Sequence, residues 1–489
     1  MKKSIILALL VLFISLSACG GGGGGGGNSS SPEPEVTNIQ AVDLSVSTTE
    51  GDAIEFTMNA LDTDISVLSC NIENYPSHGT LKQISGATWK YTPNEDFSGI
   101  DKLVYTLSKG TIKSNPATVT ITVDTVGKII YVTTSGSTEN SGSSWSDALK
   151  HPQDAMNKAT SGDQIWVAEG TYYAIDSSKP EIPVLALKEG VRIYGGFKGT
   201  ETYRSERNVS TNVTILDGQE NIYHVVKGIQ SSRIDGFTIQ NGDATVDNTI
   251  IIKEEETGGG MLNNNCSDSL IISNCCFLNN NAKGYGGGMT NQGGSSPRII
   301  NCRFTDNNAY YGGGIFNSES SAQITNCLFE GNNAYYGGAI RNSHSSPSVI
   351  NCTISGNNAL LGGALYNLSS TATARNCIIW GDTDTEIFKD NYSTIITSYS
   401  CIQGGAGGTG NISKNPQFVA TGSRDKISKK WIPGDYRLQA NSPCIDAADG
   451  DSAPALDLNG QARLDILSIA NTGTGLITYA DMGVYEYAP

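Results

Sequence analysis

A repeat of about 25 residues in the second half of the chain restricts its fold more than any other feature. Cysteine marks each copy, at successive spacings of 27, 25, 25 and 25 residues. The marker cysteines are Cys275, Cys302, Cys327, Cys352 and Cys377, and Cys401 follows 24 residues after the last of them. A fixed period of this length indicates a solenoid, in which one supersecondary unit stacks on the next.

Further columns of residues repeat in step with the cysteines. The asparagines before the markers are Asn274, Asn301, Asn326, Asn351 and Asn376, and the apolar residues two places after them are Phe277, Phe304, Phe329, Ile354 and Ile379. A second polar column is Asn280, Asn307, Asn332, Asn357 and Asp382, and a third, after a glycine-rich turn, is Asn291, Asn317, Asn342 and Asn367. Helical repeats are excluded because the copies are rich in Gly and Asn and lack a 3.6-residue period.

These columns predict a β-solenoid of short strands, each pairing with its own copy in the next coil. Identical side chains then lie about 4.8 Å apart, so stacked asparagine amides form hydrogen-bonded ladders. Asparagine also tolerates the left-handed backbone of a sharp corner. One cysteine per coil does not converge on a metal, and stacked Cβ atoms lie farther apart than a disulfide prefers. Buried, reduced thiols that act as small hydrophobic residues are the favoured interpretation.

The repeat resembles that of chlamydial polymorphic outer-membrane proteins. The resemblance rests on Phe-x-x-Asn and Gly-Gly-Ala-Ile at residues 329–332 and 337–340, and it covers about residues 258–382. It implies a right-handed parallel β-helix and a role as a surface adhesin. Residues 145–172, interpreted as a short amphipathic helix, a turn and a strand, resemble the N-terminal cap and first coil of pectin-lyase-like β-helices. The expected β-helix spans residues 128–414, and residues 415–489 resemble the choice-of-anchor module of bacterial surface β-helix proteins.

Residues 1–18 have the pattern of a bacterial signal peptide. Lysines precede a short apolar run, and residues 16–19 read Leu-Ser-Ala-Cys, which resembles a lipobox. The resemblance implies that Cys19 carries a lipid and holds the protein at the membrane, and Gly20 after it favours the outer membrane. Residues 19–35, rich in Gly, Ser and Pro, are interpreted as a tether. The expected localisation is extracytoplasmic, as an outer-membrane or cell-surface lipoprotein.

Residues 36–124 are expected to fold as a small β-sandwich. Residues 53–58 and 117–123 are strand candidates, separated by turn signals. Phrases at residues 91–99 and 103–107 resemble bacterial Ig-like and cadherin-like modules, which implies the role of a spacer. Asp62 and Asp64 lie where such modules sometimes bind calcium. No full set of oxygen ligands can be recognised there, so surface acids beside a turn are the favoured interpretation.

The charge balance limits the choice of partners. The net charge is −16, and lysine and arginine form no long cluster, so nucleic acid is excluded as a partner. No cofactor is evident from the sequence, and Ca²⁺ is the one ion that this acidity would help to bind. No second apolar run is long enough to span a membrane.

One column of side chains is predicted to face outward from the strand after each glycine-rich turn. It contains Leu262, Thr290, Phe316, Arg341 and Tyr366, with Tyr310, Tyr311, Tyr335 and Tyr336 nearby. Aromatic rings and an arginine on a flat face could stack on sugar rings and hydrogen-bond their hydroxyl groups. The candidate glycan-binding residues are therefore Tyr310, Phe316, Tyr335, Arg341 and Tyr366. The alternative is that these side chains belong to the core ladders or cover turns.

An enzyme is the main alternative to a binding protein. A polysaccharide lyase needs a cation beside a uronate and a base, and a glycosidase needs two carboxylates at a set separation. The repeats offer Arg298, Arg303, Arg341, His344 and Arg375, which sit in different columns and are interpreted as solvated surface charges. The expected function is adhesion or glycan binding, to a polysaccharide or to a host or neighbouring cell surface. A lyase or glycosidase comes second and a structural envelope protein third.

Overall fold

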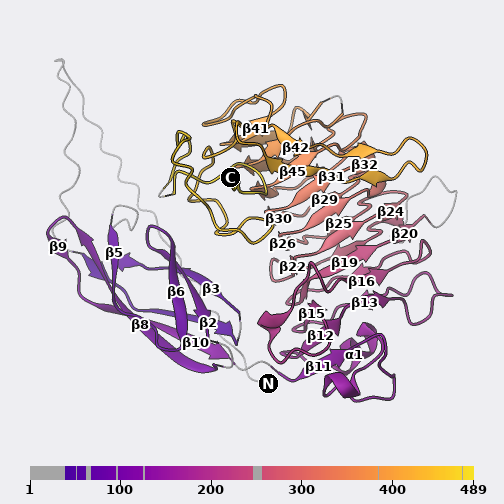
Figure 1. Ribbon diagram of the computed structural model, residues 1–489, viewed down its shortest axis with the longest axis horizontal. Helices are drawn as coiled ribbons and strands as arrows, with labels where there is room; N and C mark the ends of the chain where they lie inside the picture. Colours follow the sequence, from indigo (N-terminus) through magenta and orange to yellow (C-terminus); the bar gives the residue numbers. More distant parts are fainter. Residues whose placement is uncertain are drawn as a thin grey trace, which may run out of the picture.

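The computed structural model describes residues 39–50, 52–61, 68–94, 97–124, 127–245, 256–383, 385–475 and 477–489. The predicted signal peptide and tether, with Cys19, and the acids Asp62 and Asp64 lie outside these ranges. The described chain is an all-β protein, in which an Ig-like sandwich precedes a right-handed parallel β-helix, as Figure 1 shows. Among the described residues, no helix has the length and apolar character needed to cross a membrane.

The Ig-like sandwich packs two sheets around a core that includes Trp89, Tyr91 and Tyr105. One sheet contains β2 (Leu44–Thr49), β10 (Ala117–Asp124), β8 (Gly99–Lys109), β5 (Ser69–Asn74) and β9 (Ile112–Lys113). The other contains β3 (Ile54–Thr57), β7 (Thr88–Pro93) and β6 (Gly79–Ser85), and β1 (Gln40–Ala41) pairs with β4 (Ala60–Leu61). Side chains of β10 alternate between buried and half-buried, because successive residues of a strand point to opposite faces. The two predicted strands are thus confirmed.

The β-helix has three long parallel sheets. The ten-stranded sheet contains β11 (Ile129–Val132), β12 (Gln164–Ala168), β15 (Arg192–Phe197), β18 (Arg233–Asp235), β22 (Ile271–Ser273), β26 (Arg298–Ile300), β30 (Gln323–Thr325), β34 (Ser348–Ile350), β37 (Thr371–Arg375) and β40 (Thr394–Ser398). The nine-stranded sheet contains β13 (Gly170–Tyr172), β16 (Thr214–Asp217), β19 (Phe237–Gln240), β23 (Cys276–Leu278), β27 (Arg303–Thr305), β31 (Leu328–Glu330), β35 (Thr353–Ser355), β38 (Ile378–Ile379) and β41 (Cys401–Ile402). The eight-stranded sheet contains β14 (Leu185–Ala186), β17 (Val226–Lys227), β21 (Met261–Asn264), β25 (Met289–Gln292), β29 (Ile315–Ser318), β33 (Ile340–Ser343), β36 (Leu365–Leu368) and β39 (Ile387–Lys389).

A four-stranded sheet lies outside these three. It contains β20 (Asp243–Ala244), β24 (Asn281–Ala282), β28 (Asn308–Tyr311) and β32 (Asn333–Tyr336). Strands of this sheet follow those of the nine-stranded sheet in the chain and precede the glycine-rich turns. The sheet therefore forms a fourth side of the middle coils, with its own exposed face.

The predicted ladders are present, and they fix the register of the coils. Buried amides link Asn263, Asn291, Asn317, Asn342 and Asn367 through hydrogen bonds of 2.8–2.9 Å. The asparagines that precede the marker cysteines have φ between +48° and +57°, the left-handed conformation expected at a corner. The rings of Phe277, Phe304 and Phe329 stack with centroids 4.7 and 4.8 Å apart. All cysteines of the described residues are free thiols, and those of the marker column are buried.

The first coil is covered by two short helical turns. The 3₁₀ turn η2 (Trp145–Asp147) precedes helix α1 (Pro152–Lys158), so the predicted single helix is divided into two pieces. Proline at the first position of α1 explains the division, because it starts a helix and disfavours helical backbone before it. Helix α1 buries Pro152, Ala155 and Met156 and thus covers the open end of the apolar core.

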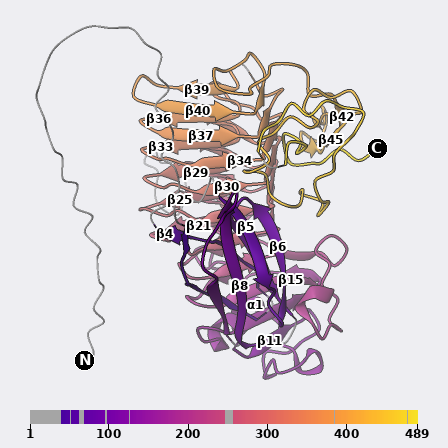
Figure 2. The ribbon, with the colours of Figure 1, turned by 90° about the vertical axis from the view of Figure 1, so that its left-hand side faces the viewer.

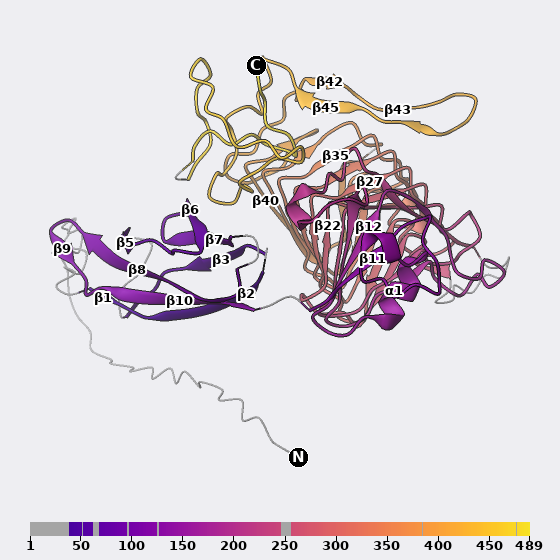
Figure 3. The same ribbon diagram turned by 60° about the horizontal axis from the view of Figure 1, so that its bottom comes forward.

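The C-terminal residues after the last coil fold back along the side of the β-helix. They contain β42 (Phe418–Ala420), β45 (Asp435–Leu438), β43 (Ser423–Arg424) and β44 (Trp431–Ile432). Their apolar side chains cover Leu328, Ile378 and Cys401 on the outer face of the nine-stranded sheet. Figures 2 and 3 show this C-terminal module and the Ig-like sandwich on the flanks of the β-helix.

Candidate functional site

The predicted outward column points away from the core, but other side chains cover it. Leu262, Thr290 and Phe316 are 4%, 0% and 6% exposed, which contradicts the expected open face. Phe316 stacks on Tyr285 with a centroid separation of 4.5 Å. Tyr366 stacks on Phe388 at 4.6 Å. The sequence placed these side chains on the correct side of the strand, but it did not reveal that the segment before each glycine turn folds over them.

Arg341 lies within this covered column, surrounded by aromatic rings. Its guanidinium carbon lies 3.8 Å from the centroid of Tyr311, 5.3 Å from that of Tyr366 and 5.6 Å from that of Phe316. Its Nε and Nη1 atoms are buried and have no hydrogen-bond partner among the described residues. Burial lowers the pKa of Arg341, against the opposing effect of Tyr311 and Tyr366. The guanidinium therefore makes cation–π contacts between coils, and it does not form an open binding subsite.

Tyr310 and Tyr335 are the two exposed candidates, each 44% exposed, whereas Arg341 and Tyr366 are half-buried. They border a hollow of about 680 Å³ on the four-stranded sheet, whose other side carries Asn281, Asn308 and Asn333. The two tyrosine rings stack on each other, with centroids 5.0 Å apart and planes at 11°. Their mutual stacking leaves mainly ring edges and hydroxyl groups for a ligand. The hollow thus offers a row of amides and phenol groups rather than flat aromatic faces.

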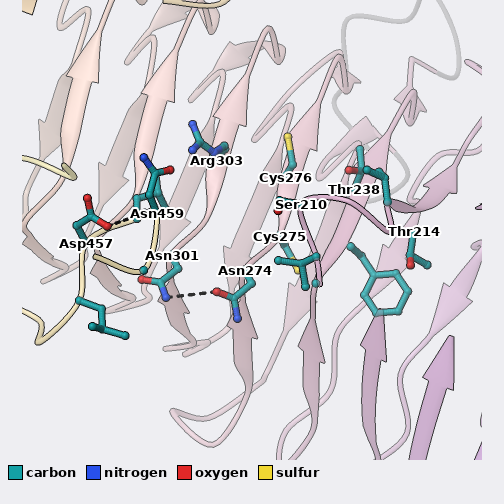
Figure 4. Close-up of a pocket in the computed structure, with 17 residues that line it drawn as sticks. Ser210, Thr214, Thr238, Asn274, Cys275, Cys276, Asn301, Arg303, Asp457 and Asn459 are labelled. Carbon is teal, nitrogen blue, oxygen red and sulfur yellow. Dashed lines mark hydrogen bonds between the residues drawn. The ribbon is translucent and has the colours of Figure 1, made fainter. Parts of the chain in front are cut away.

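A second hollow lies between the β-helix and the C-terminal module, and we name it the inter-module groove. It has a volume of about 500 Å³. It is lined by Val209, Ser210, Val213, Thr214, Gly236, Phe237, Thr238, Asn274, Cys275, Cys276, Asn301, Arg303, Leu456, Asp457, Leu458, Asn459 and Gly460. Figure 4 shows its polar side chains crossing several coils, from Asp457 and Asn459 at one end to Thr214 at the other.

The floor of the inter-module groove is the outer face of the nine-stranded sheet. Thr238, Cys276 and Arg303 occupy one register column on β19, β23 and β27. The inward neighbours in these strands are Phe237, Phe277 and Phe304, so the alternation of each strand turns the column outward. The next residue of the column, Leu328, is covered by the C-terminal module. The groove therefore begins where that module ends.

Asparagine amides from the corners of the coils form one wall. Asn301 donates to Asn274 over 3.3 Å, and Asn274 donates to Asp235 over 3.0 Å. Both asparagines have left-handed φ, which turns their side chains along the edge of the groove. The opposite wall is the loop at residues 456–460. The carboxylate of Asp457 orders this loop by accepting hydrogen bonds from the backbone N–H groups of Asn459, Gln461 and Glu486.

Arg303 is the cation that lines the groove. Its guanidinium carbon lies 5.8 Å from the centroid of Tyr485, and no ion pair joins it to a carboxylate among the described residues. Burial raises the pKa of Tyr485, while Arg303 partly opposes this rise. The guanidinium of Arg303 therefore interacts with Tyr485 and also lines the groove.

The lining of the groove carries one carboxylate and two thiols. Asp457 is the carboxylate among the lining residues, and both of its oxygens accept backbone hydrogen bonds, so the pair that glycoside hydrolysis needs is absent from this lining. Burial raises the pKa of the Cys276 thiol to about 11 even though Arg303 lowers it, so the thiol is neutral at pH 7. In the described part of the chain, no group of three His, Cys, Asp or Glu side chains is placed to hold a metal ion.

Sequence reasoning named Arg303 only as one of several isolated charges, and it missed the groove. The other wall comes from residues 456–460, more than 150 positions away in the chain. His344 and Arg375 do not line the groove, and Arg298 is exposed on the neighbouring sheet. Arg375 pairs instead with Asp449 over 3.1 Å and thereby helps to fasten the C-terminal module.

Comparisons with known proteins agree with this architecture. Residues 34–122 match the family described as bacterial Ig domain, and residues 289–424 match the right-handed β-helix region. Residues 134–296 match a family described as protein of unknown function (DUF1565). No curated protein matches the chain.

Two solved structures were also found among similar folds. One is pectate lyase Pel9A, with 17% identity, a TM-score of 0.36, and coverage of 74% of this chain and 97% of that one. The other is a sialyltransferase from Photobacterium damsela, with 13% identity, a TM-score of 0.15, and coverage of 40% and 42%. The family matches, together with the observed strands, establish a bacterial Ig-like domain followed by a right-handed parallel β-helix.

Proposed function

We propose that this protein binds a glycan in the inter-module groove, as a β-helix protein displayed on a bacterial surface. The observation that carries the proposal is the composition of the groove. The hydroxyl of Thr238 and the guanidinium of Arg303 lie on the floor, and the amides of Asn274 and Asn301 line the adjoining wall. Such groups satisfy the hydroxyl groups of a sugar, and the apolar parts of Val209 and Val213 suit its C–H faces.

The shape of the groove also suits a chain rather than a compact ligand. Thr238, Cys276 and Arg303 belong to consecutive coils, which lie about 4.8 Å apart. A polysaccharide that lies along the column would therefore meet a new set of donors on each coil. The neutral thiol of Cys276 and the engaged carboxylate of Asp457 support binding without cleavage.

Attachment to the membrane is part of the same proposal. Lipidation of Cys19 would hold the protein at the outer membrane, and the glycine-rich tether would extend the folded part from it. A glycan-binding groove at that place would serve adhesion to a polysaccharide or to another cell. The Ig-like sandwich would then act as a spacer between the lipid and the groove.

A glycan array probed with the purified full chain tests the proposal. The double variant Arg303→Ala with Asn459→Ala removes one donor from the floor and one amide from the facing loop. Arg437→Ala is the control, because it removes an arginine outside the groove, in the C-terminal module that also carries Asn459; this arginine is 62% exposed and paired with Asp435. We expect the double variant to lose binding and the control to retain it. Equal binding by both variants would overturn the proposal.

The same purified chain tests two alternatives, a second glycan site and a polysaccharide lyase. Tyr310→Ala with Tyr335→Ala removes the exposed tyrosines and tests whether the hollow on the four-stranded sheet contacts the same glycan. A polysaccharide lyase would generate an unsaturated product, detected by ultraviolet absorbance on incubation with polygalacturonate or alginate. Absorbance that appears with the native chain and disappears with Arg303→Ala would show that the groove cleaves the polysaccharide, and would overturn a role in binding alone.

A further inference from the structure

Three arginines of the β-helix meet one carboxylate of the Ig-like sandwich. Arg204 and Arg233 each approach Asp52 Oδ1 at 3.0 Å, and Arg192 approaches Oδ2 at 3.4 Å. Arg192 also donates to the hydroxyl of Thr49 over 2.7 Å. We name Arg192, Arg204 and Arg233 the arginine triad. Asp52 is 15% exposed, so it is largely enclosed by the triad.

The backbone of the β-helix places the three arginines of the triad on one surface. Arg192 and Arg233 are register partners on β15 and β18, so both point from the outer face of the ten-stranded sheet. Arg204 comes from the 3₁₀ turn η3 (Arg204–Glu206), and it is held by Tyr194, whose hydroxyl accepts its hydrogen bond at 3.0 Å. The same ring lies 4.8 Å from its guanidinium carbon. The β-helix thus supplies all three guanidinium groups, and it holds that of Arg204 through Tyr194.

A fourth arginine connects the triad to the inter-module groove. Arg207 pairs with Asp235 over 2.6 Å, and Asp235 also accepts a hydrogen bond from Asn274, which lines the groove. Val209, two residues after Arg207, lines the same groove. The triad and the groove therefore lie on neighbouring parts of one surface, separated by a single hydrogen-bonded acid.

This concentration of positive charge contrasts with the rest of the molecule. The chain carries a net charge of −16, yet three arginines converge on one carboxylate. Burial would raise the pKa of Asp52, but Arg204, Arg233 and Arg192 together lower it, so the carboxylate is ionised at neutral pH. Convergent guanidinium groups are suited to planar carboxylates, which they bind through charge-assisted hydrogen bonds.

We propose that the arginine triad is a binding site for the uronate carboxylate of an acidic polysaccharide, and that Asp52 occupies this site as an internal ligand until the polysaccharide displaces it. The proposal rests on the proposed function, because it extends the glycan in the groove to the triad. The chain passes from Asp124 at the end of β10 to Ile129 at the start of β11 within five residues. The Ig-like sandwich therefore stays close to the triad and competes at a high effective concentration.

The test compares the native full chain with Asp52→Asn in calcium-free buffer. The probes are polygalacturonate and its fully methyl-esterified form, which has the same backbone without the charge. We expect Asp52→Asn to bind polygalacturonate about tenfold more tightly, equivalent to about 1.4 kcal/mol, and the ester with unchanged affinity. Adding Arg204→Gln and Arg233→Gln should remove this gain. Arg192→Gln, with the most exposed side chain of the triad at 28%, is the milder variant should the triple variant not fold.

The outcomes of these binding measurements distinguish the arginine triad from the inter-module groove. Asp435→Asn is the control for net charge, since it removes an acid that is paired with Arg437 elsewhere on the surface. Unchanged affinity of Asp52→Asn for polygalacturonate, an equal gain for the ester, or the same gain in Asp435→Asn would each overturn the proposal. Loss of ester binding in Arg303→Ala with Asn459→Ala concerns only the groove. If that double variant binds normally while Asp52→Asn shows its gain, the triad stands and the groove assignment fails.

Discussion

Replacing Asn332 with alanine tests whether the buried amide ladders stabilise the coils. The Oδ1 atom of Asn332 accepts hydrogen bonds from the backbone N–H and the side-chain amide of Asn307, at 3.1 and 2.9 Å. Its Nδ2 donates to Phe304 O and to Asn357 Oδ1, both at 2.8 Å. Asn332 is fully buried, so water cannot replace these contacts.

The expected loss follows from the groups that remain without partners. Asn332→Ala leaves two donors of Asn307 buried without their acceptor, at a cost of about 1–2 kcal/mol each. The free energy of unfolding should therefore fall by about 3 kcal/mol. Asn308 provides a matched comparison, because it also stands in an asparagine ladder, with hydrogen bonds of 2.8 and 2.7 Å, but its side chain is exposed. Asn308→Ala should change stability by less than about 0.5 kcal/mol.

Urea unfolding combined with hydrogen exchange measures both variants. Each coil contacts mainly its neighbours, so amide protection in β31 and in the two flanking coils reports the local free energy. The calculation would be refuted if Asn332→Ala lost no more stability than Asn308→Ala. It would also be refuted if protection fell equally in the distant first coils.

Three further perturbations test other parts of the molecule. Cys19→Ala should release the protein from membranes into the soluble fraction, and unchanged fractionation of the variant would contradict lipid anchoring. Gly331→Asn should displace the C-terminal module and shift the fluorescence of Trp431, because a Cβ at Gly331 would lie 2.3 Å from that ring. Gly381→Asn is the control that should leave the fluorescence unchanged, because the atom nearest to a Cβ at Gly381 is 3.6 Å away. Burial, with nearby acids, raises the pKa of Asp446 to about 6 from 3.8, so its contribution to stability is present below pH 3.8 and is lost as pH rises through 6. Asp446→Asn should match the native Tm near pH 3.5 and exceed it above pH 6.5, and a lower Tm of the variant at pH 8 would indicate a cationic partner of this carboxylate.

The sequence by itself determined the β-helix and its internal ladders. Identical residues at a fixed period must stack when each strand pairs with its own copy, so Asn307, Asn332 and Asn357 could be placed one above another from spacing alone. The inward direction of Phe304 and Phe329 followed in the same way, because apolar residues recur in one column. Such features depend on neighbours in the next coil, and the period of the repeat identifies those neighbouring residues.

Only the tertiary structure decided which outward positions are free and which form sites. Phe316 and Arg341 point away from the core as predicted, but the preceding segment of each coil covers them. Arg303 and Asn459 line one groove, and Asp52 meets Arg233 across 181 positions of the chain. Contacts between the β-helix and its flanking modules follow no period, so no column of the repeat encodes them. Their physical basis is the packing of separate units, which the local pattern of either unit does not specify.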